Sequence, residues 1–470
     1  MLRSIIIYER TRRISSIICT IGFVCFLLAG LAATKVCIGS DLDRIRPYEK
    51  NPSFWQYKGE PVMLIGGNKD DNTFQIPNLE SYLDEMVSVG ANYVRNVMSS
   101  RDEGNQRAFR KLSSGEYDLN QWNQEYWKRL ENLLIWSAER DIIVQITLWD
   151  RFDYYRDEWE SSPWNPKNNI NYSAVESGLA KSYPEHPSRD TNPFMYVGNK
   201  VMHQQKKWVD KILSYTLPAK NVLYNMANEH QSSDKGRAWC EYWVGYVRDK
   251  ASKEGVAIET TQLYDRQNWE SVVNQPDLYT FVEGAKVATQ WTAKGEGQYN
   301  TAVSLISATN QEKQRPVNGV KMRGAQNYIH YMSERGWRPL LAGFSALSWH
   351  REGQWGGLGF NATARGNIMA MRKFTDIVVP WESEPRQDLL TNRGKDEAYL
   401  RANPGRAYGI YFVNGGSVGL NLKDHEGEFL LRWMKVNQGV WEDEDTINGG
   451  KIVTLSAPGK GGWIAIVYKP

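Results

Sequence analysis

Short apolar runs alternate with segments of helical periodicity along most of this 470-residue chain, and this alternation restricts its fold most. Repeated strand–helix units of this kind build a parallel sheet covered by helices. Eight units spread over about 330 residues favour a closed (β/α)8 TIM barrel over an open, doubly wound sheet. No G-x-G-x-x-G follows the first run, which disfavours a dinucleotide-binding fold. The eight predicted strands are Pro61–Gly66, Ala91–Met98, Ile142–Leu148, Asn221–Ala227, Val256–Tyr264, Leu278–Glu283, Pro316–Met322 and Leu340–Trp349.

The helical segments between these runs have defined ends. Asn78 can cap a helix that ends at Gly90, and later helices end before Pro218 and at Gly255. The fifth unit is the weakest, because only a short, turn-like stretch separates the fifth predicted strand from the sixth. The barrel is predicted to span residues 40–381.

The pattern changes after residue 381. Residues 382–395 are charged and contain proline, which is typical of a linker. Residues 396–470 contain short strands separated by glycine-rich turns such as Asn414-Gly415-Gly416 and Asn448-Gly449-Gly450. We therefore predict an α/β chain in which a TIM barrel is followed by a small antiparallel β-sandwich domain.

The first 39 residues have the pattern of an export signal. Arg10, Arg12 and Arg13 precede Ile14–Ala33, a run without charge. This run is also long enough to cross a bilayer, so a retained membrane anchor is the alternative to a cleaved signal peptide. We expect a secreted, periplasmic or cell-surface protein that contacts a membrane only through this segment, if the segment is not cleaved.

Charge and cysteine content exclude several classes of function. The formal net charge of +3 comes from residues 1–39, which carry five Lys/Arg and one Glu, so the remainder has a net charge of −1. Nothing therefore indicates a nucleic-acid partner. The four cysteines form neither a disulfide framework nor a zinc cluster, and we expect no metal or cofactor.

The C-terminal ends of barrel strands hold the active-site residues of TIM-barrel enzymes. In this sequence those positions are rich in carboxylates, amides, cations and aromatics. They include Asn68, Asp70, Asp71, Arg95, Trp149, Asp150, Arg151, Asn228, Glu229, His230, Asp265, Glu283, Asn318, Lys321, Trp349, His350 and Arg351. Such a set suits hydrolysis of a glycosidic bond, in which one carboxyl group protonates the leaving oxygen and a second acts as nucleophile or base.

A loop of about fifty residues after the third strand supports a sugar ligand. It contains Trp159, Trp164, Asn165 and Tyr172, and aromatic and amide side chains suit sugars, which stack on rings and hydrogen-bond through hydroxyls. The alternative is an Ω-loop packed by its own aromatics. Trp149 and Trp349 are likewise either sugar platforms or packing residues of the barrel rim.

The segment Val222–Glu229 resembles the Asn-Glu end of the fourth strand in retaining (β/α)8 glycoside hydrolases of the cellulase-like clan. The resemblance extends through Trp149-Asp150-Arg151, Arg315–Asn318 and His350-Arg351 and lies near the apiosidase-like branch. Residues 408–469 resemble the collagen-binding type of β-domain that often follows such barrels. The resemblance implies that Glu229 is the catalytic acid/base and that Asn228 bonds the 2-hydroxyl of the sugar.

The seventh strand departs from the clan, whose nucleophile is a Glu at its end. Pro316–Met322 contains no carboxylate. The nearest substitute is Glu283 at the end of the sixth strand, and Asp265 and Asp150 are weaker candidates. Lys321 or Arg351 could keep one carboxylate ionised while burial raises the pKa of the other. A structural ion pair of Glu283 with Lys286 or Lys321 is the competing interpretation.

We predict an exported glycoside hydrolase that cleaves a plant or algal polysaccharide or oligosaccharide by a two-carboxylate mechanism. Glu229 and Glu283 are the expected catalytic pair. The residues expected to bind the sugar are Asn228, Trp149, Asp150, Arg151, His230, Asp265, Asn318, Lys321, Trp349, His350, Arg351 and Arg95. The alternative is a carbohydrate-binding barrel without catalysis, because the seventh strand has no carboxylate.

Overall fold

The computed structural model describes residues 41–182, 193–230, 233–264, 269–285, 295–323, 332–353 and 357–470. The predicted signal or anchor segment and Asp265 lie outside these residues. No helix in the described part of the chain is long and apolar enough to cross a membrane.

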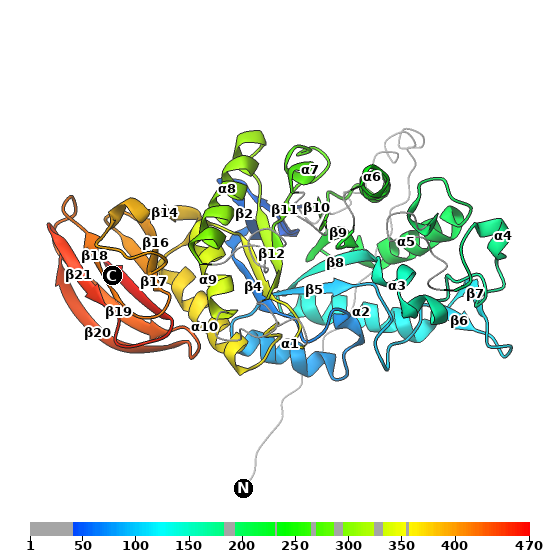
Figure 1. The fold of residues 1–470 in the computed structure, drawn as a ribbon, viewed down its shortest axis with the longest axis horizontal. Coiled ribbons are helices and arrows are strands. Elements are labelled where there is room, and N and C mark those ends of the chain that lie inside the picture. The colour runs from blue at the N-terminus through cyan, green and yellow to red at the C-terminus, as the bar shows by residue number, and fades with distance from the viewer. Residues whose placement is uncertain are drawn as a thin grey trace, which may run out of the picture. The chain divides into compact units, whose positions relative to one another are not determined.

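Eight parallel strands form one sheet in the order β10-β9-β8-β5-β4-β13-β12-β11 (Figure 1). Backbone bonds from Thr280 and Phe281 to the carbonyl of Thr260 join its two ends, so the predicted TIM barrel is confirmed. In chain order the strands are β4 (Leu64–Gly67), β5 (Tyr93–Val97), β8 (Ile143–Asp150), β9 (Val222–Asn228), β10 (Thr260–Thr261), β11 (Val282–Glu283), β12 (Val317–Met322) and β13 (Ala346–Trp349).

A helix follows each barrel strand. In the same order these helices are α1 (Leu79–Ser88), α2 (Gln124–Glu139), α5 (Met202–Thr216), α6 (Asp234–Lys253), α7 (Glu270–Val273), α8 (Glu296–Glu312), α9 (Met332–Ala342) and α10 (Ala362–Ile377). The single turn of α7 explains why the fifth unit is weak in the sequence. The predicted strand that starts at Leu340 is wrong at its beginning, because Leu340–Ala342 end α9, which continues past an internal proline, Pro339.

The elements outside the repeat cover the barrel ends. An antiparallel sheet of β1 (Arg46–Tyr48), β2 (Asn51–Tyr57) and β3 (Glu60–Val62) precedes the barrel. Trp55 of β2 is fully buried beside Phe281 and donates to the side-chain oxygen of Asn318, so this sheet closes the N-terminal end of the barrel. Longer loops near the opposite end carry β6 (Phe109–Lys111), β7 (Tyr117–Trp122), α3 (Phe152–Tyr155) and α4 (Ala174–Ser177).

Two antiparallel sheets form the C-terminal domain, in the orders β14-β16-β17-β22-β19-β20 and β15-β18-β21. Apolar residues of both sheets share one core, as expected for a β-sandwich. The strands are β14 (Glu384–Pro385), β15 (Leu390–Thr391), β16 (Ala398–Asn403), β17 (Ala407–Phe412), β18 (Ser417–Asn421), β19 (Glu428–Lys435), β20 (Val440–Asn448), β21 (Ile452–Ser456) and β22 (Trp463–Tyr468). Residues 382–395, which the sequence indicates as a linker, thus contribute one strand to each sheet.

The sandwich packs directly on helices of the barrel. Trp337 of α9 stacks on Tyr411 of β17 at 5.5 Å between ring centroids. A Cβ atom added at Gly409 of β17 would lie 2.2 Å from the ring of Phe374 in α10. This close approach requires glycine, because any side chain at residue 409 would overlap that ring.

We expect Gly409→Ala to destabilise the protein by about 1–3 kcal/mol, because the new methyl group overpacks the contact with Phe374. Gly245→Ala is the matched control: residue 245 lies in α6 with open space around its Cβ position, so the change should stabilise by up to about 1 kcal/mol. Urea unfolding measures both. Equal midpoints for Gly409→Ala and the wild type would contradict this account of the contact.

Candidate active site

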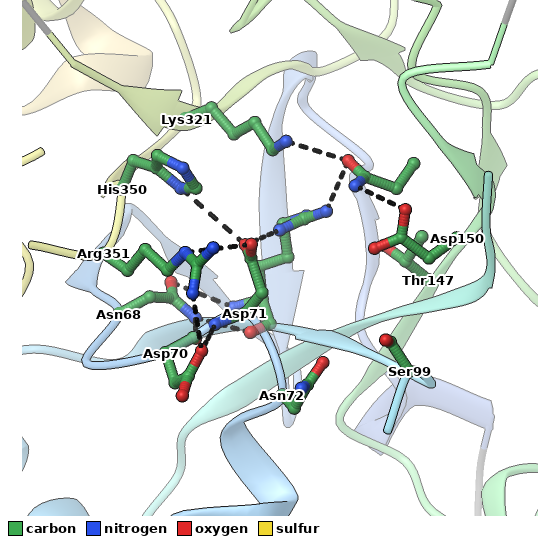
Figure 2. A network of polar contacts seen from close by, with 12 residues as sticks. Asn68, Asp70, Asp71, Asn72, Ser99, Thr147, Asp150, Lys321, His350 and Arg351 are labelled. Atoms are coloured by element: carbon green, nitrogen blue, oxygen red, sulfur yellow. Dashed lines mark hydrogen bonds and ion pairs between the residues drawn. The ribbon is translucent and has the colours of Figure 1, made fainter. Parts of the chain in front are cut away.

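Asp71, in the loop after β4, is the centre of a buried charge network at the C-terminal end of the barrel (Figure 2). Its Oδ1 lies 2.7 Å from Nη1 of Arg95 and 3.8 Å from Nδ1 of His350. Its Oδ2 lies 3.2 Å from Nε of Arg351 and 3.4 Å from Nη2 of Arg101. Burial raises the pKa of Asp71, but the surrounding cations outweigh burial and hold this pKa well below its usual range. Asp71 is therefore an ionised carboxylate at neutral pH.

Asn228, the last residue of β9, joins the ends of four strands. Its Oδ1 accepts hydrogen bonds from Nη2 of Arg95 and from Nζ of Lys321, each at 2.8 Å. Its Nδ2 donates to Oδ1 of Asp150 at 3.1 Å. Asp150 ends β8 and Lys321 lies near the end of β12. The network therefore holds side chains from the second, third, fourth and seventh barrel strands in one cluster.

Glu229 follows Asn228 in a left-handed backbone conformation, with φ of +50°. A bulky residue rarely adopts this region, and such strain concentrates at functional sites. Its Oε1 lies 2.6 Å from Nζ of Lys321 and its Oε2 lies 3.8 Å from Nη2 of Arg151. These two cations favour the ionised form of the Glu229 carboxylate.

A second group of carboxylates surrounds Arg101, in the loop after β5. Arg101 forms ion pairs with Asp71, Asp150 and Asp153. Asp153 lies on α3, and its Oδ1 also accepts a hydrogen bond from Oγ of Ser99 at 2.8 Å. Burial, followed by the charge of Asp150, raises the pKa of Asp153 to about 7, although Arg101 opposes the shift. Asp153 is therefore a carboxyl group that can hold a proton near neutral pH.

Glu283, the predicted partner of Glu229, lies in the barrel interior. Its Oε1 accepts hydrogen bonds from the backbone N–H groups of Ala285 at 2.9 Å and Val320 at 3.2 Å. Its Oε2 accepts one from Gln145 of β8 at 3.4 Å. Burial raises the pKa of Glu283 to about 7. Both oxygens thus bond to donors on barrel strands or, for Ala285, just after one.

Several predicted sugar-binding residues belong to the core. The ring of Trp149 is 1% exposed and packs against Trp239 and Trp243 of α6, and Trp349 is fully buried. Neither ring can stack on a sugar in this structure, because helices cover both. Trp149 and Trp349 are therefore packing residues, the second of the two interpretations that the sequence left open. His230 is likewise buried and stacked on Trp239.

The other predicted residues divide between the two ends of the barrel. Asn318 lies toward the N-terminal end of the barrel, where its Nδ2 donates to the hydroxyl of Tyr93 at 3.3 Å. His350 lies at the network, and burial holds its pKa well below the usual range, so its ring is neutral. Arg351, with 36% of its side chain exposed, contacts both Asp70 and Asp71 at the rim.

Arg101 and Asp153 belong to this cluster, and the sequence analysis did not single them out. Asp153 follows Asp150 by three residues just beyond a predicted strand, a spacing that could have indicated a second carboxyl group there. Arg101 had no comparable signal, because nothing local predicts that a loop arginine turns back to three aspartates. Among the described residues, no group of three or more His, Cys, Asp or Glu side chains could hold a metal ion.

Several solved structures with a similar architecture are described as glycoside hydrolases. A family 5 glycoside hydrolase from Bacteroides vulgatus ATCC 8482 superposes with a TM-score of 0.64 at 11% identity, covering 91% of this chain and 94% of that one. A second structure, described as a glycoside hydrolase, gives a TM-score of 0.62 at 11% identity over 91% and 97% of the two chains. A family 30 endoxylanase from Clostridium papyrosolvens C71 gives 0.50 at 10% identity over 87% and 97%.

Sequence comparison adds nothing to this likeness. No protein-family description matches the chain, and no curated protein matches it. At 10–11% identity, the structural likeness shows that the chain shares the barrel-based fold of these enzymes.

The raised pKa of Asp153 predicts a pH-dependent effect on stability. The folded protein binds this proton up to about pH 7, whereas an unfolded Asp releases it near 3.8, so stability falls as the pH rises through this window. Asp153→Asn removes the penalty. Relative to the wild type, it should gain up to about 4 kcal/mol between pH 4 and pH 8.

Denaturant unfolding at several pH values measures this gain. Asp84→Asn, at an aspartate whose side chain is 63% exposed, is the control and should show no comparable trend. A constant difference in stability between Asp153→Asn and the wild type would exclude proton binding by Asp153 in this range.

Proposed function

We propose that this chain is a glycoside hydrolase that cleaves O-glycosidic bonds in a plant or algal polysaccharide or oligosaccharide. The observation that carries the proposal is the position of Glu229, a strained, cation-paired carboxylate directly after the fourth barrel strand. Active sites of TIM-barrel enzymes lie at this end of the barrel. The fold shared with solved glycoside hydrolases supports the same class of reaction.

Glu229 acts in its ionised form in this proposal, as nucleophile or as base toward water. Lys321 and Arg151 favour that form. The acid role that the clan resemblance implies for Glu229 would instead need the protonated form. Cleavage also needs a proton on the leaving oxygen. We assign this proton to Asp153, which ends the step as a carboxylate paired with Arg101.

Access to solvent distinguishes Asp153 from Glu283. The side chain of Asp153 is 15% exposed, and its Oδ2 makes no hydrogen bond to any residue in the described ranges. Both oxygens of Glu283 accept hydrogen bonds inside the barrel. We therefore assign Glu283 a structural role and Asp153 the role of proton donor.

The place of action belongs to the same proposal. The basic flank and uncharged run at residues 10–33 support export, either as a secreted or periplasmic protein or as one anchored at the cell surface. An extracellular polysaccharide or its fragments would then be the substrate, without a cofactor.

A carbohydrate-binding barrel without catalysis is the second candidate, and one observation favours it. Lys321 stands near the end of the seventh strand, where the clan has its nucleophile, and Asn228 Oδ1 already accepts hydrogen bonds from two cations. The seventh strand therefore offers a cation in place of the clan's nucleophile, which favours binding over cleavage.

We expect Glu229→Gln to lower hydrolysis by about 10²–10⁴-fold, because the amide cannot act as nucleophile or base. Reducing-sugar release from a panel of plant and algal polysaccharides measures the rate. Glu125→Gln, at an exposed residue of α2, is the control and should keep the wild-type rate. An active wild type with an equally active Glu229→Gln refutes the assigned centre; glycan binding without sugar release by either protein establishes the binding barrel.

The proton donor is identified by the leaving group. Asp153→Asn should slow cleavage of natural linkages by about 10²–10⁴-fold but should slow 2,4-dinitrophenyl glycosides far less, because their leaving group needs no proton. Glu283→Gln should slow both kinds of substrate by the same factor. If Glu283→Gln shows the selective loss instead, the pair predicted from the sequence is correct and Asp153 is not the donor.

A further inference from the structure

A cavity of about 630 Å³ lies against α2, between the loop that follows β4 and the loop that follows β5. Its wall includes Trp136 and Asn132 of α2, Ser81 in the first turn of α1, and Glu103 and Asn105 from the loop after β5. This volume is in the range of binding sites for small organic ligands. None of these five residues takes part in the network around Asp71 and Glu229.

Unused hydrogen-bonding groups line this cavity. Nδ2 of Asn105 is buried without a partner. The amide of Asn132 and the hydroxyl of Ser81 make no hydrogen bond to other residues within the described ranges. Buried polar groups normally have partners, so the amide of Asn105 is an exception among the residues of the wall. The half-buried ring of Trp136 stands beside these groups.

A flat aromatic ring next to amides and a hydroxyl is the chemistry that recognises a sugar. The C–H face of a pyranose packs on the ring, and its hydroxyls exchange hydrogen bonds with amide and carboxylate groups. The amide of Asn132 can donate to such hydroxyls and the exposed carboxylate of Glu103 can accept from them.

The charges of the wall select against acidic sugars. Carboxylates of Asp70, Glu80 and Glu103 face two cations, Lys69 and Arg129. Each cation already has a carboxylate partner, since Lys69 Nζ lies 3.0 Å from Glu85 and Arg129 Nε lies 2.8 Å from Glu125. Three carboxylates against two cations that each already pair with another carboxylate therefore disfavour a uronate or a sulfate.

The cavity borders the candidate active site through Asp70, which lies in its wall and contacts Nη1 of Arg351 at 3.4 Å. We propose that this cavity is a second carbohydrate site, which binds a neutral sugar unit of a glycan chain by stacking on Trp136. The site is separate from Glu229, so glycan binding there does not depend on the proposed hydrolysis.

Affinity electrophoresis of the full chain tests this proposal. The native gels contain galactomannan, arabinoxylan, mixed-linkage β-glucan or, as the acidic comparison, polygalacturonate. At least one neutral polysaccharide should retard the wild type. Trp136→Ala should weaken that binding about tenfold through the lost stacking contact, and Trp136→Phe should restore part of it.

Matched variants separate this site from others. Trp441→Ala removes a partly exposed tryptophan of β20 and should bind like the wild type. Retardation reports binding and not cleavage, so failure of the hydrolase proposal leaves this result unaffected. Asn132→Ala removes no hydrogen bond within the described residues and should fold normally while binding more weakly. No retardation by any neutral polysaccharide, retardation by polygalacturonate alone, or wild-type binding by both Trp136→Ala and Asn132→Ala would overturn the proposal.

Discussion

The guanidinium of Arg95 is the contact on which the C-terminal end of the barrel depends. Arg95 lies on the second barrel strand and is 1% exposed. Its guanidinium binds Asp71, in the loop after the first strand, and Asn228, at the end of the fourth strand. A buried charge costs several kcal/mol unless every partner is in place. Asp71 and Asn228 therefore have to stay close to Arg95, and the strand ends that carry them are held together.

This constraint extends to the chemistry of the site. Carboxylates that touch cations, such as Asp71 and Glu229, are stabilised in the ionised form. A proton donor has to be a carboxyl group whose pKa is raised by burial more than it is lowered by nearby cations. Asp153 and Glu283 both meet this condition. Environments that push the pKa values of carboxyl groups apart in this way let one site hold both an acid and a base. In the proposed mechanism, the lysine of the seventh strand keeps Glu229 ionised, and the proton comes from Asp153.

Much of the fold could be predicted because periodicity reports burial directly. The apolar runs located the eight barrel strands, and the weak fifth unit corresponds to the single turn of α7. The errors occurred where local rules conflict with tertiary packing. The eighth strand was predicted to start at Leu340, yet Leu340–Ala342 end α9. Residues 382–395 look like a linker but pair with the sandwich sheets.

By itself, the sequence determined that a parallel barrel forms, that a β-domain follows it, and that carboxylates, amides and cations gather where the strands end. These follow from hydrophobic periodicity and chain order, which are local properties. Only the tertiary structure decided which of these residues meet. It placed Trp149 under α6 and Glu283 in the barrel interior, brought Arg101 to three aspartates, and directed Lys321 to Glu229. Side-chain direction and ion pairing depend on strand register and on residues distant in sequence, so no local pattern could specify them.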